Sequence, residues 1–186
     1  MLRNTLPLPL TAAASAAAIA VVAALGAAGT ASAAPTAAPT TAGKTPTCDV
    51  SGLKALLTDK GGHQNGMSHE GTVLVLTNTS DRTCALRGYP GLQLEDAQHN
   101  AVTTNTTWGS TYFIPDPGKN TLLVRPGGSA EAALAWAHAD APRMVRAGYL
   151  RVTPPASRGF LTIPFERIVT NGDLSVTAFA RSIDVS

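Results

Sequence analysis

Short segments in which apolar residues alternate with polar ones recur from residue 53 onward, and this two-residue period is typical of half-buried β-strands. The clearest is Thr72–Thr77, whose valine, leucine and threonine side chains are bounded by turn residues. Ser129–Ala139 has the alanine content of a helix, but Leu134 and Trp136 recur at period two after a Pro-Gly-Gly turn, which favours a strand. Further strands are predicted at Leu53–Thr58, Thr83–Leu86, Leu92–Glu95, Thr121–Val124, Tyr149–Thr153, Phe160–Ile163 and Leu174–Phe179.

Turn-forming residues separate these segments. Asn78–Asp81 is predicted to join Thr72–Thr77 and Thr83–Leu86 into a hairpin, and Asn171–Asp173 has the composition of another hairpin turn. Pro164 is expected to end the strand that precedes it. About 7–9 short strands with turn chemistry between them indicate an all-β fold, an antiparallel β-sandwich.

The segment Gly88-Tyr89-Pro90-Gly91 predicts a tight structural corner. Proline fixes one φ angle, and the glycines tolerate positive φ. Tyr89 has two structural interpretations: its hydroxyl hydrogen-bonds back to the backbone at a sandwich corner, or its ring packs in the core. Neither makes it a binding residue.

The N-terminal part of the chain has the pattern of an export signal. Residues 1–33 comprise Arg3, an alanine-rich apolar run, and Ala31-Ser32-Ala33, which predicts cleavage after Ala33. An uncleaved membrane anchor is the alternative, but alanine is weakly apolar and glycines interrupt the run. Residues 34–47 are an Ala/Pro/Thr-rich linker, and residues 48–186 form the folded domain. We therefore expect a secreted protein with no stable membrane insertion after cleavage.

Charge and cysteine content narrow the function classes further. Removing Arg3 with the signal lowers the formal net charge from +2 to +1, so nucleic acid is not an expected partner. Cys48 and Cys84 are the two cysteines, and in an exported chain they are expected to form a disulfide. The alternative, a pair of reactive thiols, lacks a neighbouring histidine or a Cys-x-x-Cys motif.

Several motifs together resemble a known family. The first cysteine is followed by Asn78-x-Ser80-x3-Cys84-x-Leu86-x-Gly88-Tyr89-Pro90-Gly91, then by Pro126-Gly127-Gly128-Ser129-Ala130 and Leu150-x-Val152-x-Pro154-Pro155. In these features, which span Cys48 to Ala180, the chain resembles the actinobacterial family catalogued as domain of unknown function 4232. The resemblance implies a secreted or surface domain with an immunoglobulin-like sandwich and no established activity. Similar proteins often carry a second cysteine pair in the C-terminal half, which this chain lacks.

Motifs of catalysis are missing from the sequence. It contains no Gly-x-Ser-x-Gly, no His-Glu-x-x-His and no phosphate-binding glycine loop, so we do not expect an enzyme. His63 and His69 share a loop with Glu70, which makes a metal site conceivable. Loop histidines in a polar context are usually solvated, however, so neither a metal nor a cofactor is expected.

The segment Asn105–Asn120 is the candidate contact region. It has no strand periodicity but carries Trp108, Tyr112 and Phe113 among glycines and prolines. Aromatic side chains on a loop of a rigid sandwich can stack on a sugar ring or a partner surface. The alternative is that they cap the open end of the core.

The sequence therefore predicts a secreted, non-catalytic β-sandwich module whose partner is an unknown protein or a cell-envelope glycan. Association with the cell wall is compatible with that role. Two alternatives stay open: an extracellular hydrolase whose active site is assembled from distant loops, and a purely structural envelope protein.

Overall fold

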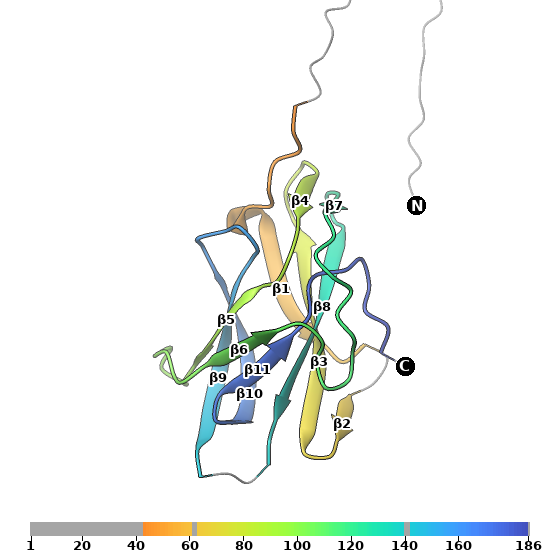
Figure 1. Ribbon diagram of the computed structural model, residues 1–186. Coiled ribbons are helices and arrows are strands. Elements are labelled where there is room, and N and C mark those ends of the chain that lie inside the picture. Colours follow the sequence, from red (N-terminus) through yellow and green to blue (C-terminus); the bar gives the residue numbers. More distant parts are fainter. Residues whose placement is uncertain (1–42, 61–62, 140–141, 186) are drawn as a thin grey trace, which may run out of the picture. The chain divides into compact units, whose positions relative to one another are not determined.

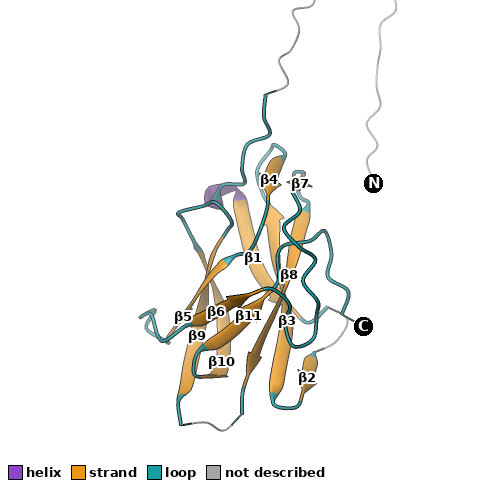
Figure 2. Cartoon of the chain, in the orientation of Figure 1, coloured by secondary structure: helices purple, strands orange, loops and turns teal. Residues whose placement is uncertain are grey.

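The computed structural model describes residues 43–60, 63–139 and 142–185. The predicted signal peptide, residues 1–33, and most of the predicted linker lie outside these residues. Within them, no helix has the length and apolar character needed to cross a membrane. Apart from a 3₁₀ turn at Val50–Gly52, their regular structure consists of β-strands (Figure 2).

The described strands form three sheets (Figure 1). The largest has the order β1-β3-β8-β11-β6, with β2 beside β3, and a second has the order β10-β9-β5. The short strands β4 and β7 pair with each other. The bounds are β1 Leu53–Thr58, β2 Gln64–Gly66, β3 His69–Asn78, β4 Cys84–Leu86, β5 Gly91–Glu95, β6 Asn105–Trp108, β7 Leu122–Val124, β8 Ser129–Ala137, β9 Met144–Thr153, β10 Leu161–Thr170 and β11 Asp173–Val176.

The main core lies between the two larger sheets. Leu74 and Leu134 from one sheet join Leu150 and Phe165 from the other in a single buried cluster. This arrangement confirms the predicted all-β sandwich. Residues 180–185 of the C-terminal segment cover part of the opposite face of the large sheet, where Ile183 packs with outward-facing side chains of β3 and β8. The middle of β3 packs on both faces, which accounts for its uninterrupted apolar run Val73–Leu76.

The number and pairing of strands differ in part from the prediction. Eleven strands are present in the described residues, where about 7–9 were expected, because β2 and β6 lie in segments without strand periodicity. In addition, β6 pairs with β11 in parallel, with Asn105 opposite Asp173. The sandwich is therefore antiparallel except at this edge.

The predicted hairpin around Asn78–Asp81 is wrong. Strand β3 pairs with β1, β2 and β8, whereas β4 pairs with β7, with Cys84 opposite Val124. The buried side-chain amide of Asn78 donates hydrogen bonds to the carbonyl oxygens of Arg82 (2.8 Å) and Val124 (2.9 Å). These bonds hold the chain in a wide turn that carries it to a different sheet.

Two further turn predictions need correction. Pro164 does not end a strand: β10 continues to Thr170, because β10 is an edge strand, where a residue without an N–H is tolerated. The Asn171-Gly172 turn exists, with φ of 55° and 76°. It is not a hairpin, however, since β11 pairs with β8 and β6 instead of β10.

The Cys48–Cys84 disulfide is present, as predicted. It ties the segment before β1 to β4. Hydrogen bonds reinforce this junction: the Cys48 N–H donates to the Ala85 carbonyl (3.0 Å), and the Ala85 N–H donates to the Pro46 carbonyl (2.7 Å). The disulfide therefore lies where the predicted linker meets the folded domain.

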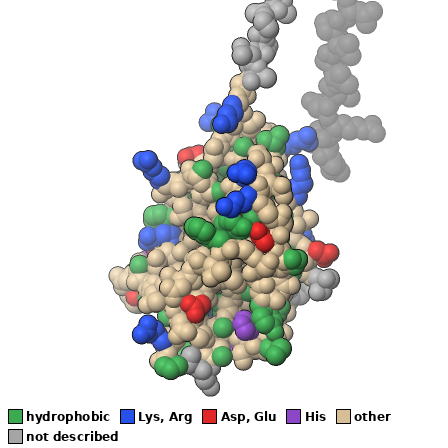
Figure 3. All heavy atoms as spheres, in the orientation of Figure 1, with side chains coloured by type: hydrophobic (Ala, Val, Ile, Leu, Met, Phe, Trp, Pro, Cys, Tyr) green, Lys and Arg blue, Asp and Glu red, His purple; other side chains and the backbone are tan. Residues whose placement is uncertain are grey.

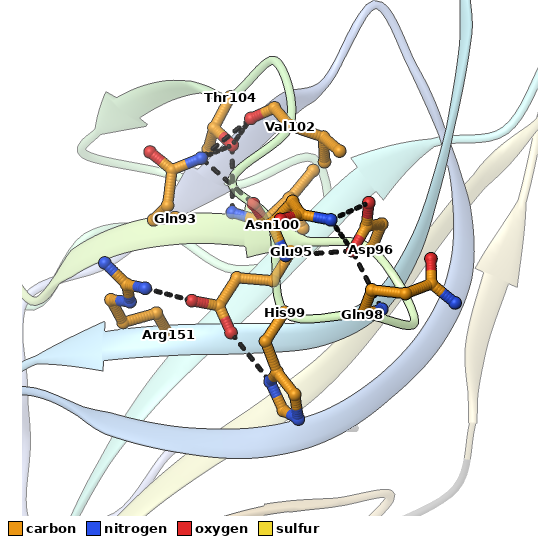
Figure 4. A network of polar contacts seen from close by, with 10 residues as sticks. Gln93, Glu95, Asp96, Gln98, His99, Asn100, Val102, Thr104 and Arg151 are labelled. Carbon is orange, nitrogen blue, oxygen red and sulfur yellow. Dashed lines mark hydrogen bonds and ion pairs between the residues drawn. The ribbon is translucent and has the colours of Figure 1, made fainter.

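The buried carboxylate of Glu95 joins several side chains on the outer face of the β10-β9-β5 sheet (Figure 4). Glu95 is 1% exposed and is paired with Arg151, while the ring of His99 lies 3.2 Å from its other oxygen. The His99 ring also stacks on Tyr149, with centroids 3.9 Å apart. In the same loop, hydrogen bonds from Asn100, led by its side-chain amide, lower the pKa of Asp96 below its ordinary value. This network fixes residues 96–100 over the sheet.

Candidate functional site

The most exposed tryptophan of the described domain lies at the end of β6. Trp108 is 60% exposed, whereas Trp136 is only 3% exposed in the core. Its ring is nearly parallel to that of Tyr89, with centroids 6.0 Å apart and an interplanar angle of 12°. Lys119 places its ammonium 5.2 Å from the Tyr89 ring. We call Tyr89, Trp108, Asp116 and Lys119 the Trp108 platform.

Hydrogen bonds to rigid backbone fix the platform. The Trp108 Nε1–H donates to the carbonyl of Pro90 at 3.1 Å, which sets the tilt of the indole. The Tyr89 hydroxyl donates to one oxygen of Asp116 at 2.6 Å, and the other oxygen accepts the Ala178 N–H at 2.8 Å. Both oxygens of the carboxylate are therefore occupied. The side chains are preorganised for contact with a ligand, so little rotamer entropy would be lost on binding.

The same contacts change the proton affinity of Tyr89. The hydrogen bond to Asp116, aided by burial and by the carboxylate charge, raises the pKa of Tyr89 above its ordinary value. The phenol therefore stays neutral and keeps its donor at any physiological pH. A raised folded-state pKa means that this contribution to stability is complete below about pH 10 and is lost as the pH rises through the folded pKa.

Replacement of Asp116 by asparagine is expected to lower the pKa of Tyr89 toward its ordinary value of about 10, because the charged acceptor is removed. Spectrophotometric titration of tyrosinate measures the change. The Tyr89→Phe variant identifies which of the three tyrosines is responsible. An unchanged titration curve in the Asp116→Asn variant would show that this hydrogen bond does not control Tyr89.

A second exposed cluster surrounds Tyr112. Its ring stacks on His69 with centroids 4.1 Å apart, and its hydroxyl lies 3.1 Å from the sulfur of Met67, which is 83% exposed. Phe113 packs edge-on against Tyr112 and lies over Gly71, where a Cβ atom would come within 2.8 Å of the phenylalanine ring. Figure 3 shows hydrophobic side chains near the middle of one face, beside Lys and Arg side chains, and again lower down beside a histidine.

The structure thus separates the three aromatic residues singled out in Asn105–Asn120. Trp108 joins Tyr89, whereas Tyr112 and Phe113 join Met67 and His69. Phe113 is half-buried, in accord with the capping alternative, while Trp108 and Tyr112 are exposed. Sequence reasoning missed the neighbours of these rings, because Tyr89, His69 and Met67 lie in distant segments.

The corner at Gly88–Gly91 has a role beyond changing the chain direction. Gly88 has a φ of 109°, so glycine is needed there, and Gly91 begins β5. Tyr89 does not bond to backbone through its hydroxyl and is only half-buried. Both structural interpretations of this side chain are therefore replaced by one in which the corner positions Tyr89 beside Trp108.

Histidines and carboxylates gather at one end of the sandwich. Glu70 lies 3.5–3.9 Å from Arg167, His63 and His138, while His63 also approaches Asp59. His69 instead bonds to the Met67 carbonyl and stacks on Tyr112. In the part of the chain that the structure describes, no three such side chains are arranged to hold a metal ion.

Comparison with known proteins gives one match. No curated protein and no solved structure is significantly similar to the chain. A family model matches residues 48–180, which covers the whole sandwich from the first cysteine to the segment after β11. The chain belongs to the family described as Domain of unknown function (DUF4232).

Proposed function

We propose that this protein is a secreted, non-catalytic module that binds a glycan of the cell envelope through the Trp108 platform. The observation that carries the proposal is an exposed, flat indole held at its N–H edge by the Pro90 carbonyl and flanked by Tyr89. The C–H groups on one face of a pyranose ring are apolar and weakly positive. They complement the negative face of an indole, which makes such a surface suitable for stacking a sugar.

The polar groups around the platform favour a sugar over a protein partner. Two exposed hydroxyl side chains, Thr107 and Ser110, lie close to Trp108 in the sequence, and the exposed Lys119 lies beside the Tyr89 ring. These polar groups can hydrogen-bond to sugar hydroxyl groups. A stable protein interface needs about 800 Å² on each partner, with a largely apolar centre. A single exposed indole with a polar margin is better matched to one or two sugar rings.

Export agrees with this role. The predicted signal at residues 1–33 and the disulfide are both typical of proteins that act outside the cytoplasm. A linker between the signal and the domain would let the binding surface reach the envelope.

The Trp108→Ala variant is expected to weaken binding to isolated cell-wall polysaccharide by about tenfold or more, since loss of one stacking contact costs about 1.4 kcal/mol or more. The measurement is co-sedimentation of the full exported chain with insoluble wall material over a range of concentrations. Trp108 is exposed, so its removal should change the free energy of unfolding by about 1 kcal/mol at most.

The matched control is Phe160→Ala, which removes another exposed aromatic ring from a different strand region. This variant should sediment with the wall as the unmodified chain does. Equal retention of the Trp108→Ala variant and the unmodified chain would exclude the platform as the binding surface. Retention by envelope proteins but not by purified polysaccharide would exclude the glycan.

A further inference from the structure

A surface trough of about 480 Å³ lies where the β4–β7 pair meets the start of β8 and the C-terminal segment. Thr83, Leu123 and Ser129 line it, together with two arginines, Arg125 and Arg181. We call it the arginine trough. Sites for small organic ligands have volumes of about 300–1,000 Å³, so the trough is larger than a single ion needs.

The two guanidinium groups of the trough have no acidic partner. Neither Arg125 nor Arg181 forms an ion pair within the described part of the chain. By contrast, Lys60, Arg151 and Arg167 each lie within ion-pair distance of a glutamate. The described residues that line the trough include no aspartate or glutamate. Two like charges that share a site repel each other, and a bound anion would remove that cost.

The carboxylate that lies closest to the trough along β8 is already occupied. Glu131 is two residues after Ser129, so the two side chains lie on the same face of the strand. The Lys60 ammonium donates to both carboxylate oxygens of Glu131, at 3.1 and 3.2 Å. The Ile183 N–H donates to one of them at 2.8 Å. The charge of Glu131 is therefore balanced by Lys60 and not by the trough arginines.

Two other carboxylates are near the trough only in the sequence. Asp81 precedes Thr83 by two residues, and Asp184 follows Arg181 by three. Both are exposed, and neither lines the trough or forms an ion pair with a described residue. The positive charge of the trough is therefore open to a ligand.

Hydrogen bonds fix the backbone that carries both arginines. The Gly128 N–H donates to the Arg125 carbonyl at 2.8 Å, which closes the turn after β7. Ala180 exchanges two backbone hydrogen bonds with Glu131, at 2.8 and 2.9 Å, so Arg181 directly follows a residue docked on β8. Only the side chains remain to be ordered when a ligand binds, which lowers the entropy cost of binding.

The chemistry of the lining selects an organic oxyanion. A guanidinium group presents parallel N–H donors that match two oxygens of a phosphate or a carboxylate. Leu123 is 50% exposed and gives the trough an apolar surface on which C–H groups can pack. A hydrated inorganic ion would leave that surface uncovered.

We propose that the arginine trough binds a phosphate or carboxylate group carried on an organic chain. The guanidinium groups of Arg125 and Arg181 donate to the oxygens of the anion, and the carbon chain packs on Leu123. The proposal goes beyond the proposed function, since the Trp108 platform requires no charge on its ligand.

The trough and the platform are separate sites joined by a short stretch of chain. None of the four residues of the platform lines the trough. The Ala178 N–H donates to Asp116 of the platform, and Arg181 follows Ala178 by three residues. Three residues span at most about 11 Å, so an anionic polymer of the envelope can reach both sites at once.

Titration of the protein with propyl phosphate and with butyrate tests this proposal. Backbone amide signals of Thr83 and Ser129 in proton–nitrogen correlation NMR should shift saturably, with a Kd in the millimolar range. The anion that binds more tightly identifies the group that the trough prefers. Propanol lacks the charge and should not bind. Inorganic phosphate lacks the carbon chain and should bind about threefold more weakly than propyl phosphate.

Arg125→Gln and Arg181→Gln should each weaken binding of the preferred anion by about threefold, and the double variant by about tenfold, because both side chains are exposed. Arg146→Gln removes the same charge from an exposed position on β9 outside the trough and should leave binding unchanged. The Trp108→Ala variant should also bind the anion normally, which separates this test from the polysaccharide assay.

Three results would each overturn the proposal, whatever the outcome for wall polysaccharide. The first is the absence of a saturable shift with both organic anions. The second is equal binding of propyl phosphate and either propanol or inorganic phosphate. The third is unchanged anion binding by the Arg125→Gln/Arg181→Gln double variant.

Discussion

The Cys48→Ala/Cys84→Ala double variant is expected to lose about 3–4 kcal/mol of its free energy of unfolding. The disulfide closes a loop of 36 residues, and in the chain-entropy model its removal releases that constraint in the unfolded state. For a domain of this size such a loss is a large part of the total stability. Urea denaturation monitored by tryptophan fluorescence measures the change.

Reduction of the unmodified protein provides the control for the cysteine variant. The reduced chain should lose a similar amount, and intact-mass analysis with alkylation should find no free thiol before reductant is added. Two free thiols in the unreduced protein would contradict the disulfide. A loss of unfolding free energy below about 1 kcal/mol would instead show that the disulfide contributes little to the stability of the domain.

The Arg151→Ala variant is expected to lose about 3 kcal/mol, close to the lower limit for breaking a buried ion pair. The side chain of Glu95 is 2% exposed, so its carboxylate would stay buried without its main partner. Arg151 itself is 32% exposed, and water can partly replace it, which keeps the loss from being larger. The variant also removes the stacking of the guanidinium on Phe160. Thermal and urea denaturation measure the effect.

The Glu95→Leu/Arg151→Met double variant separates the two contributions. Removing both charges should restore most of the stability, since well-packed apolar side chains can substitute for a buried pair. If the double variant is less stable than Arg151→Ala, Glu95 must be held mainly by His99 and by other contacts of the loop at residues 96–100.

The strands that the sequence predicted best are those with alternation and strong turns on both sides. Thr72–Thr77 lies within β3, and Ser129–Ala139 contains β8 and extends two residues past its end; side chains of both strands pack on both faces of the central sheet. Pairing was harder to predict. The turn after Asn78 depends on hydrogen bonds to Val124, a residue 46 positions away, which local turn chemistry does not reveal.

The candidate site was predictable only in part. An aromatic-rich segment without periodicity pointed to Trp108, but β6 exists because β11 provides its backbone partner. Tyr89 was interpreted as structural since its ring and Trp108 are brought together only by the fold. Glu70 was assigned to a loop by the sequence, whereas in the structure it lies in β3, on the same alternation as Thr72, Leu74 and Leu76.

The parallel pairing of β6 with β11 has a consequence for the order in which the molecule matures. Asn105 bonds to Asp173, 68 residues later, and β11 is the one strand beside β6 in the sheet. Ribosomes make the chain from its N-terminus. Strand β11, the partner of β6, is therefore made after nearly all of the domain. Such non-local pairing is slow to form. The strand that ends at Trp108 therefore gains its backbone partner only after β11, the last of the described strands, has docked.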